Sequence, residues 1–71
     1  MPTMHEVESS TMRAIGYDED RSELYIEFTS GELYAYSLVP RRIFRELFDA
    51  DSKGQYFNRS IRNVYSYRKL T

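Results

Sequence analysis

The clearest pattern in the chain is an alternation of apolar and polar side chains over residues 23–28. The apolar positions share one face of an extended segment, and they are Leu24, Ile26 and Phe28. Tyr25 and Glu27 fall on the opposite face. Because side chains alternate between the two faces of a strand, the segment is predicted to be a strand with one face in the core and one solvent-exposed face that includes Tyr25. An earlier strand is predicted over 11–17, with a bulge where its apolar spacing breaks near 13–14.

A loop of three residues, 29–31, is predicted to join this strand to a third strand over 32–37. Gly31 closes the loop, because such hairpins end on a residue with positive φ. This register places Tyr34 and Tyr36 on the same face as the apolar residues of the preceding strand. A two-residue loop would reverse the faces of the third strand. The three-residue loop is preferred because tyrosine rings fill the core of a small domain better.

Pro40 marks the change from strands to helices, since its fixed φ suits the first position of a helix. Apolar residues follow at helical spacing, and they are Ile43, Phe44, Leu47 and Phe48. A helix is therefore predicted over 40–50 with Phe44 and Leu47 buried, ending at the polar run 51–54. A second, shorter helix is predicted near 59–64, with Asn58 as its cap. For the end of the chain, residues 65–70, both a helix and an extended segment are open, and the Tyr-Ser-Tyr alternation favours the extended one.

These elements predict the α+β class: a three-stranded antiparallel meander followed by two helices packed on one face of the sheet. The 71 residues are enough for a single domain, 1–71, of which residues 1–6 are expected to be frayed. The chain has no cysteine and no long apolar run, which excludes a disulfide framework and a membrane span. Residues 1–10 also lack the pattern of a signal peptide. A cytoplasmic protein without membrane contact is expected.

Catalytic and metal-binding motifs are absent from the sequence. His5 is the only histidine, and without a cysteine or second histidine it cannot form a nucleophile–base pair or a metal-ligand set. The segment 18–22 has the opening spacing of a calcium loop, but Glu23 and Thr29 stand where glycine and glutamate are needed. We therefore expect no enzyme, no metal and no cofactor.

Charge is divided unevenly along the chain. Residues 1–37 carry eight acidic and two basic side chains, whereas residues 38–71 carry eight basic and three acidic ones. In the basic half, Arg59 and Arg62 lie three apart on one face of the predicted second helix, without an acid within a turn. The charge split is consistent with an anion-attracting face or with two halves of the chain that attract one another. For the arginines and tyrosines, three interpretations are open: solvated charge around a tyrosine core, a nucleic-acid surface of arginines and stacking rings, or a protein contact.

Several short motifs together resemble the KTSC domain family, over about residues 7–70. They are Val7-Glu8-Ser9-Ser10, Ile15-Gly16-Tyr17-Asp18, Leu24-Tyr25-Ile26-Glu27-Phe28, Gly31, Tyr34-Ala35-Tyr36, Val39-Pro40, Tyr56-Phe57-Asn58, Ile61-Arg62 and Tyr65-Ser66-Tyr67. The family is named for the C-terminal region of some lysyl-tRNA synthetases and also occurs in small bacterial and phage proteins. The family has no established catalytic activity, so the resemblance implies a domain without catalysis, and its occurrence in tRNA synthetases suggests RNA as a ligand. The resemblance also places Asn58 and Arg62 at polar positions of the family's second motif.

The leading hypothesis is a small non-catalytic domain that binds nucleic acid, RNA in particular, through its basic C-terminal half. The expected site residues are Arg41, Asn58, Arg59, Arg62, Arg68 and Lys69, with Tyr56 or Tyr67 as a stacking face. The alternative is a protein–protein interaction or self-association module, with a protein partner or a homodimer formed through exposed Tyr25 and the open side of the sheet.

Overall fold

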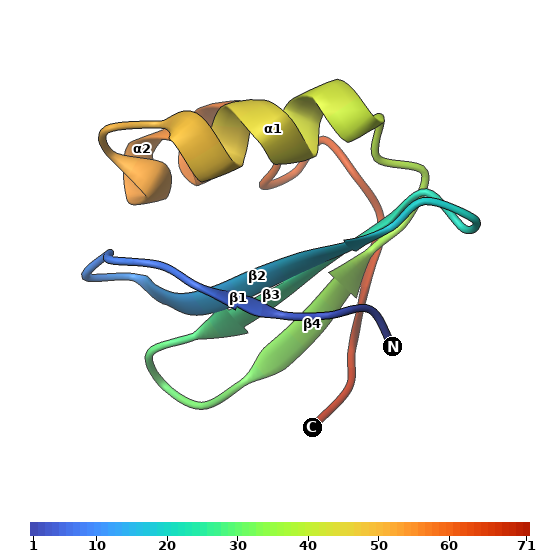
Figure 1. Ribbon diagram of the computed structural model, residues 1–71, viewed down its shortest axis with the longest axis horizontal. Coiled ribbons are helices and arrows are strands. Elements are labelled where there is room, and N and C mark those ends of the chain that lie inside the picture. The colour runs from blue at the N-terminus through green and yellow to red at the C-terminus, as the bar shows by residue number, and fades with distance from the viewer.

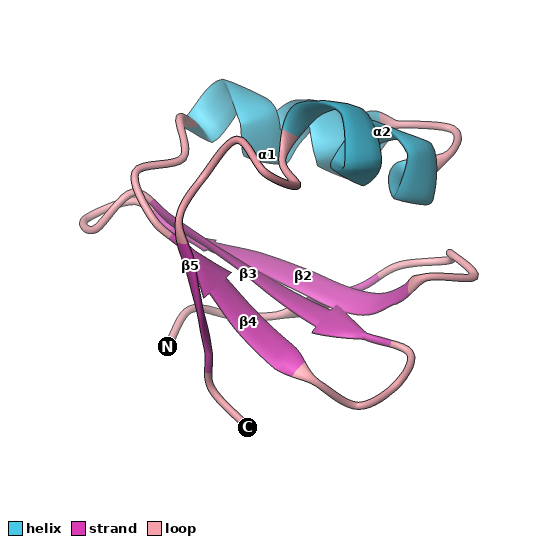
Figure 2. Cartoon of the chain, turned by 180° about the vertical axis from the view of Figure 1, so that it is seen from behind, coloured by secondary structure: helices cyan, strands magenta, loops and turns pink.

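The computed structural model describes residues 1–71 as one antiparallel sheet with two helices over one of its faces (Figure 1). The sheet has five strands in the order β1-β2-β3-β4-β5. The elements, in chain order, are β1 His5–Glu6, β2 Met12–Asp18, β3 Glu23–Phe28, β4 Leu33–Tyr36, α1 Arg41–Asp49, α2 Lys53–Ser60 and β5 Tyr67–Lys69. Figure 2 shows that the segment after α2 returns to the sheet, so that β5 lies beside β4.

The central meander, β2-β3-β4, agrees with the sequence-based prediction. The register between β2 and β3 shifts between Met12 and Ala14, which confirms the bulge. At the next hairpin, the Gly31 N–H donates to the Phe28 carbonyl at 2.9 Å, and Gly31 has a φ of 97°. Pairing of Ile26 with Tyr34 then fixes the predicted register, with Tyr34 facing the helices.

The two edge strands were not predicted, and the α+β class holds with five strands rather than three. Both are short and polar in sequence, so they carry no alternation that would mark a strand. The expectation that residues 1–6 are frayed is wrong at β1, because His5 pairs with Ile15 in β2. The chain before β1 also lies against Gly16: a Cβ built there would stand 2.7 Å from the Thr3 carbonyl oxygen.

The second helix lies earlier in the chain than predicted. Its N-cap is Ser52, whose hydroxyl accepts a hydrogen bond from the Gln55 N–H at 3.4 Å, and Asn58 lies inside the helix. The polar run 51–54 was interpreted as a helix break because it contains Gly54. That glycine instead allows close packing, since a Cβ there would stand 2.8 Å from the Thr11 hydroxyl. Of the two conformations left open for the end of the chain, the structure has the extended one, as β5.

The core lies between the sheet and the helices. Its fully buried side chains are Met12, Ile15, Leu24, Ile26, Val39, Leu47 and Ile61. On α1, Leu47 is buried as predicted, whereas Phe44 is half-buried and stacks on Tyr17 with ring centroids 5.4 Å apart. No helix is long and apolar enough to cross a membrane.

The face of the sheet away from the helices is not open at Tyr25. This side chain is only 5% exposed, contrary to the sequence-based expectation. Tyr25 lies opposite Gly16, where the N-terminal segment crosses the sheet, and its hydroxyl donates to Glu23 at 2.9 Å. The proposed self-association surface around Tyr25 is therefore wrong, because the chain itself covers it.

Candidate functional site

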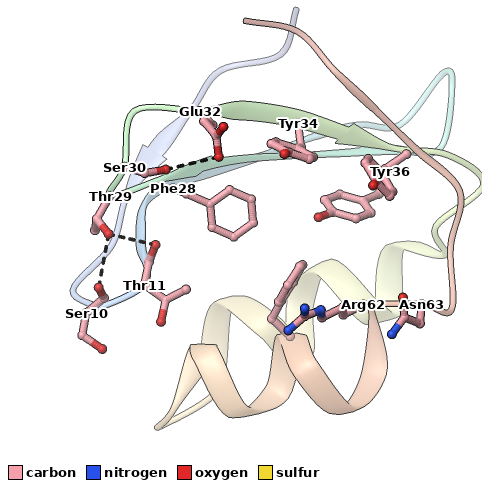
Figure 3. A pocket seen from close by; sticks show the side chains of 12 residues that line it. Ser10, Thr11, Phe28, Thr29, Ser30, Glu32, Tyr34, Tyr36, Arg62 and Asn63 are labelled. Atoms are coloured by element: carbon pink, nitrogen blue, oxygen red, sulfur yellow. Dashed lines mark hydrogen bonds between the residues drawn. The ribbon is translucent and has the colours of Figure 1, made fainter.

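An open groove of about 620 Å³ lies between the helix-facing side of the sheet and the end of α2 (Figure 3). It extends from the β3–β4 hairpin to the segment between α2 and β5. Its lining residues are Ser10, Thr11, Phe28, Thr29, Ser30, Glu32, Tyr34, Tyr36, Phe57, Arg62, Asn63 and Tyr67. The groove therefore collects side chains from four separate parts of the chain.

Aromatic rings form the walls of the groove. Phe57 on α2 meets Tyr36 edge-on, with centroids 5.7 Å apart, and meets Phe28 in the same way at 5.4 Å. Tyr34 stacks on Tyr36 at 6.3 Å, and Tyr67 on β5 lies 5.3 Å from Tyr34. Strand alternation explains this wall, because Tyr34 and Tyr36 project from the same side of β4 and Tyr67 pairs beside Tyr36. The deeper rings are buried, whereas Tyr67 is 62% exposed at the rim.

The tyrosine hydroxyls separate into two groups. Three of them donate to acceptors within the chain: Tyr17 to the Val39 carbonyl, Tyr25 to Glu23 and Tyr56 to Glu46. The hydroxyls of Tyr34, Tyr36 and Tyr67, which line the groove, have no hydrogen-bond partner within the chain. Burial, followed by the neighbouring hydroxyls, raises the pKa of Tyr36 to about 12. Its hydroxyl therefore stays protonated near neutral pH and can donate to a ligand.

Arg62 is the cation of the groove. It follows the end of α2, and its backbone N–H donates to the Phe57 carbonyl at 2.9 Å. Its guanidinium extends beneath Tyr36 toward the open space (Figure 3). No carboxylate lies within 4.0 Å of it, whereas five other basic residues have such a partner. The groove thus combines stacking faces, free hydroxyls and one unpaired positive charge.

Three of the other predicted basic site residues are paired with the acidic half of the chain. Arg41 lies 3.5 Å from Glu19, and Lys69 lies 2.9 Å from Glu32.

Arg68 contacts both carboxylate oxygens of Glu23, at 2.5 and 3.4 Å. The Arg68 hydrogen bond holds the pKa of Glu23 below its usual value, against burial, which raises it. These contacts attach β5 to the sheet, and they favour the interpretation in which the two halves of the chain attract one another.

Arg59 and Tyr56 lie on another side of α2. The Arg59 guanidinium stands over the Tyr56 ring at 5.4 Å from its centroid, beside a separate hollow that both residues line. Tyr56 is buried, and its hydroxyl donates to Glu46 at 2.6 Å, so it does not offer the stacking face that was expected. Because α2 ends at Ser60, Arg59 and Arg62 do not share a helix face, and that part of the prediction is wrong.

Asn58 is exposed and lines a third, entirely polar hollow. It neither caps a helix nor reaches the groove. The groove thus brings together only two of the predicted site residues, Arg62 and Tyr67, whereas Arg59 and Tyr56 meet outside it.

The family model for the KTSC domain matches residues 8–65 of the chain. The protein belongs to the KTSC domain family. An uncharacterised protein of Stutzerimonas stutzeri is 43% identical over 65 residues, which cover 90% of this chain and 92% of the relative. A crystal structure of a KTSC domain protein from Yersinia pestis has a TM-score of 0.96 and 34% identity, with full coverage of both chains.

Longer proteins also contain a KTSC domain similar to this one. A lysine–tRNA ligase of Nostoc sp. is 39% identical over 64 residues, and that of Nostoc punctiforme is 36% identical. The match covers 90% of this chain but only 11% of each ligase. The domain is therefore a small part of those enzymes.

The assignment of Tyr34 and Tyr36 to the core face is confirmed, since Tyr36 belongs to the core cluster of this KTSC domain and Tyr34 packs against it. Sequence reasoning missed that these side chains also border a groove. One signal was available: two adjacent hydroxyls on one face of a strand need polar partners or solvent, which an apolar core does not offer. Phe57 and Asn63 carried no such signal, since their positions depend on where α2 ends.

Proposed function

We propose that this KTSC domain binds single-stranded nucleic acid, with RNA as the preferred ligand, through the aromatic groove. The observation that carries the proposal is Arg62, an arginine without an acidic partner that extends into a groove walled by aromatic rings. Unpaired bases stack on tyrosine and phenylalanine, and arginine binds phosphate. The proposal is a binding function without catalysis.

The distribution of ion pairs supports a narrower site than the sequence suggested. Arg41, Arg68 and Lys69 already have carboxylate partners, so a phosphate at these residues would compete with an existing contact. Arg59 has no carboxylate within 4.0 Å but stands over Tyr56 outside the groove. Arg62 is thus the proposed phosphate contact, and Tyr67, at the exposed rim, is the proposed stacking face.

The relatives provide weaker support for RNA. The ligases that carry a similar domain are named for tRNA, and a domain attached to such an enzyme has access to RNA. Because the domain is a small fraction of those enzymes, we do not extend their activity to this chain.

The salt dependence of binding tests this proposal. Fluorescence anisotropy with a labelled single-stranded RNA would be measured at several salt concentrations for the wild type, Arg62→Gln and Arg59→Gln. If Arg62 neutralises one phosphate, its loss flattens the slope of log K against log salt by about 0.7. Arg59→Gln is the matched control, since it removes the same charge three residues away, and we expect its slope to match that of the wild type.

Equal slopes for the wild type and Arg62→Gln would contradict the proposed site. Binding of protein partners without any binding of RNA would favour the alternative, a protein-interaction module. That surface would have to lie away from Tyr25, which the N-terminal segment covers.

A further inference from the structure

The size of the groove suits a small ligand. Its volume of about 620 Å³ falls within the range of about 300–1,000 Å³ that is typical of small-molecule sites. One end is bounded by the β3–β4 hairpin and the other by Asn63 (Figure 3). Tyr67 also lies at this second end, because it pairs with Tyr36, the last residue of β4. Sites that follow a strand over several nucleotides instead have a basic groove along the backbone.

The charges around the groove suit one phosphate. Arg62 is the only arginine or lysine among the lining residues. Glu32, the one lining carboxylate, is neutralised by Lys69 at 2.9 Å and lies at the hairpin end, away from Arg62. A ligand with a single negative group near Arg62 is therefore complementary to the groove, whereas a chain of phosphates would leave most of its charges without a partner.

The hydrogen-bonding groups of the groove suit the polar edge of a base or ribose. The Tyr36 hydroxyl is oriented into the space between the sheet and Arg62, and it has no partner within the chain (Figure 3). Ser10 and Thr11 place two more side-chain hydroxyls at the opposite end. An exposed tyrosine ring at the rim, with polar groups at both ends of the groove, matches an aromatic base attached to a sugar phosphate.

We infer that the groove holds one unpaired nucleotide, with its base against Tyr34 and the exposed ring of Tyr67 and its single phosphate on Arg62. This inference rests on the proposed function and specifies which part of the nucleic acid enters the groove. The same chemistry is present in a free nucleoside monophosphate and in an unpaired nucleotide of an RNA strand.

Titration of the full chain with ribonucleoside 5′-monophosphates, followed by NMR of the aromatic side chains, tests the inference. We expect saturable shifts of the Tyr34 and Tyr67 ring signals with a monophosphate, and weaker binding of the corresponding nucleoside. Inorganic phosphate alone should leave the ring signals in place. Equal ring shifts with inorganic phosphate would overturn the inference, because they would show that no base is recognised.

A pair of hydroxyl deletions provides the matched control. Tyr36→Phe keeps the ring in the wall but removes one hydrogen bond, so the affinity for the monophosphate should fall by about 2- to 10-fold. Tyr65→Phe removes a hydroxyl that also has no partner within the chain but lies outside the groove, so its affinity should equal that of the wild type. Equal affinities of all three proteins would overturn the placement of the ligand.

Two RNA hairpins distinguish the sources of the nucleotide. One is blunt with a tightly closed loop, and the other carries a single-nucleotide overhang. Tighter binding of the overhang hairpin than of the free monophosphate would support the inference with RNA as the source, and the reverse order would support it with the free nucleotide. If a single-stranded RNA binds through Arg62 but monophosphates neither bind nor compete, the inference fails while the proposed function stands. If no RNA binds, the proposed function fails.

Discussion

Truncation of Leu47 to alanine should destabilise the domain more than any surface change on the same helix. Leu47 is 0% exposed and packs in the core beneath α1. Leu47→Ala removes three carbon atoms, worth about 2.4 kcal/mol of transfer free energy at about 0.8 kcal/mol each. The cavity left behind brings the expected loss to about 2.7–5 kcal/mol. A domain of 71 residues has a total stability of about 4–11 kcal/mol, so the variant should be close to unfolding.

Thermal and urea unfolding followed by circular dichroism measure this loss. At about 4–8 °C per kcal/mol, the Tm of Leu47→Ala should fall by more than about 10 °C. Phe48→Ala is the matched control on the same helix, because Phe48 is 41% exposed and its contacts are edge and tilted ring contacts with His5 and Phe44. The control should lose about 1 kcal/mol. Similar Tm values for the two variants would refute the packing of α1 described above.

Two further predictions concern the hairpin and the attachment of β5. Gly31 has a φ of 97°, and a Cβ there would meet no atom within 4 Å. Gly31→Val should therefore lower the free energy of unfolding by about 1–2 kcal/mol through backbone strain alone. An unchanged urea midpoint would contradict this prediction. The Arg68 hydrogen bond lowers the pKa of Glu23 in the folded state. The stabilisation of the fold by this pair is therefore complete at pH values above the ordinary glutamate pKa of about 4.3, and it is lost as the pH falls through the lower pKa of the folded state. Urea midpoints between pH 5 and 3 should therefore fall more for the wild type than for Glu23→Gln, and parallel pH profiles would contradict this role of the pair.

The central part of the fold could be predicted because local signals and packing agree there. The alternation over β3, the glycine that closes the hairpin and the proline before α1 each specify one element, and their register follows from which faces must be buried. The misplaced second helix shows where local signals mislead. Gly54 is unfavourable inside a helix but is required by the close approach of Thr11, which is distant in the sequence.

The site was harder to predict than the fold because its charges are sorted by tertiary contacts. Glu23 and Arg68 are 45 residues apart, and only the pairing of β5 with β4 brings them together. The sequence shows an acidic half and a basic half but cannot tell which basic residues remain without a carboxylate partner. Likewise, Arg59 and Arg62 share a face only if one helix contains both, and α2 ends between them.

The most direct test of the account is to map RNA binding onto the structure by NMR. An isotopically labelled sample of the chain would be titrated with a short single-stranded RNA, and the shifts of the backbone amides would be compared residue by residue. If the groove is the RNA site, the largest shifts cluster there, around Tyr36, Phe57, Arg62 and Tyr67. Shifts that cluster at Arg41 or Arg59 instead, or a spectrum unchanged by RNA, would contradict it.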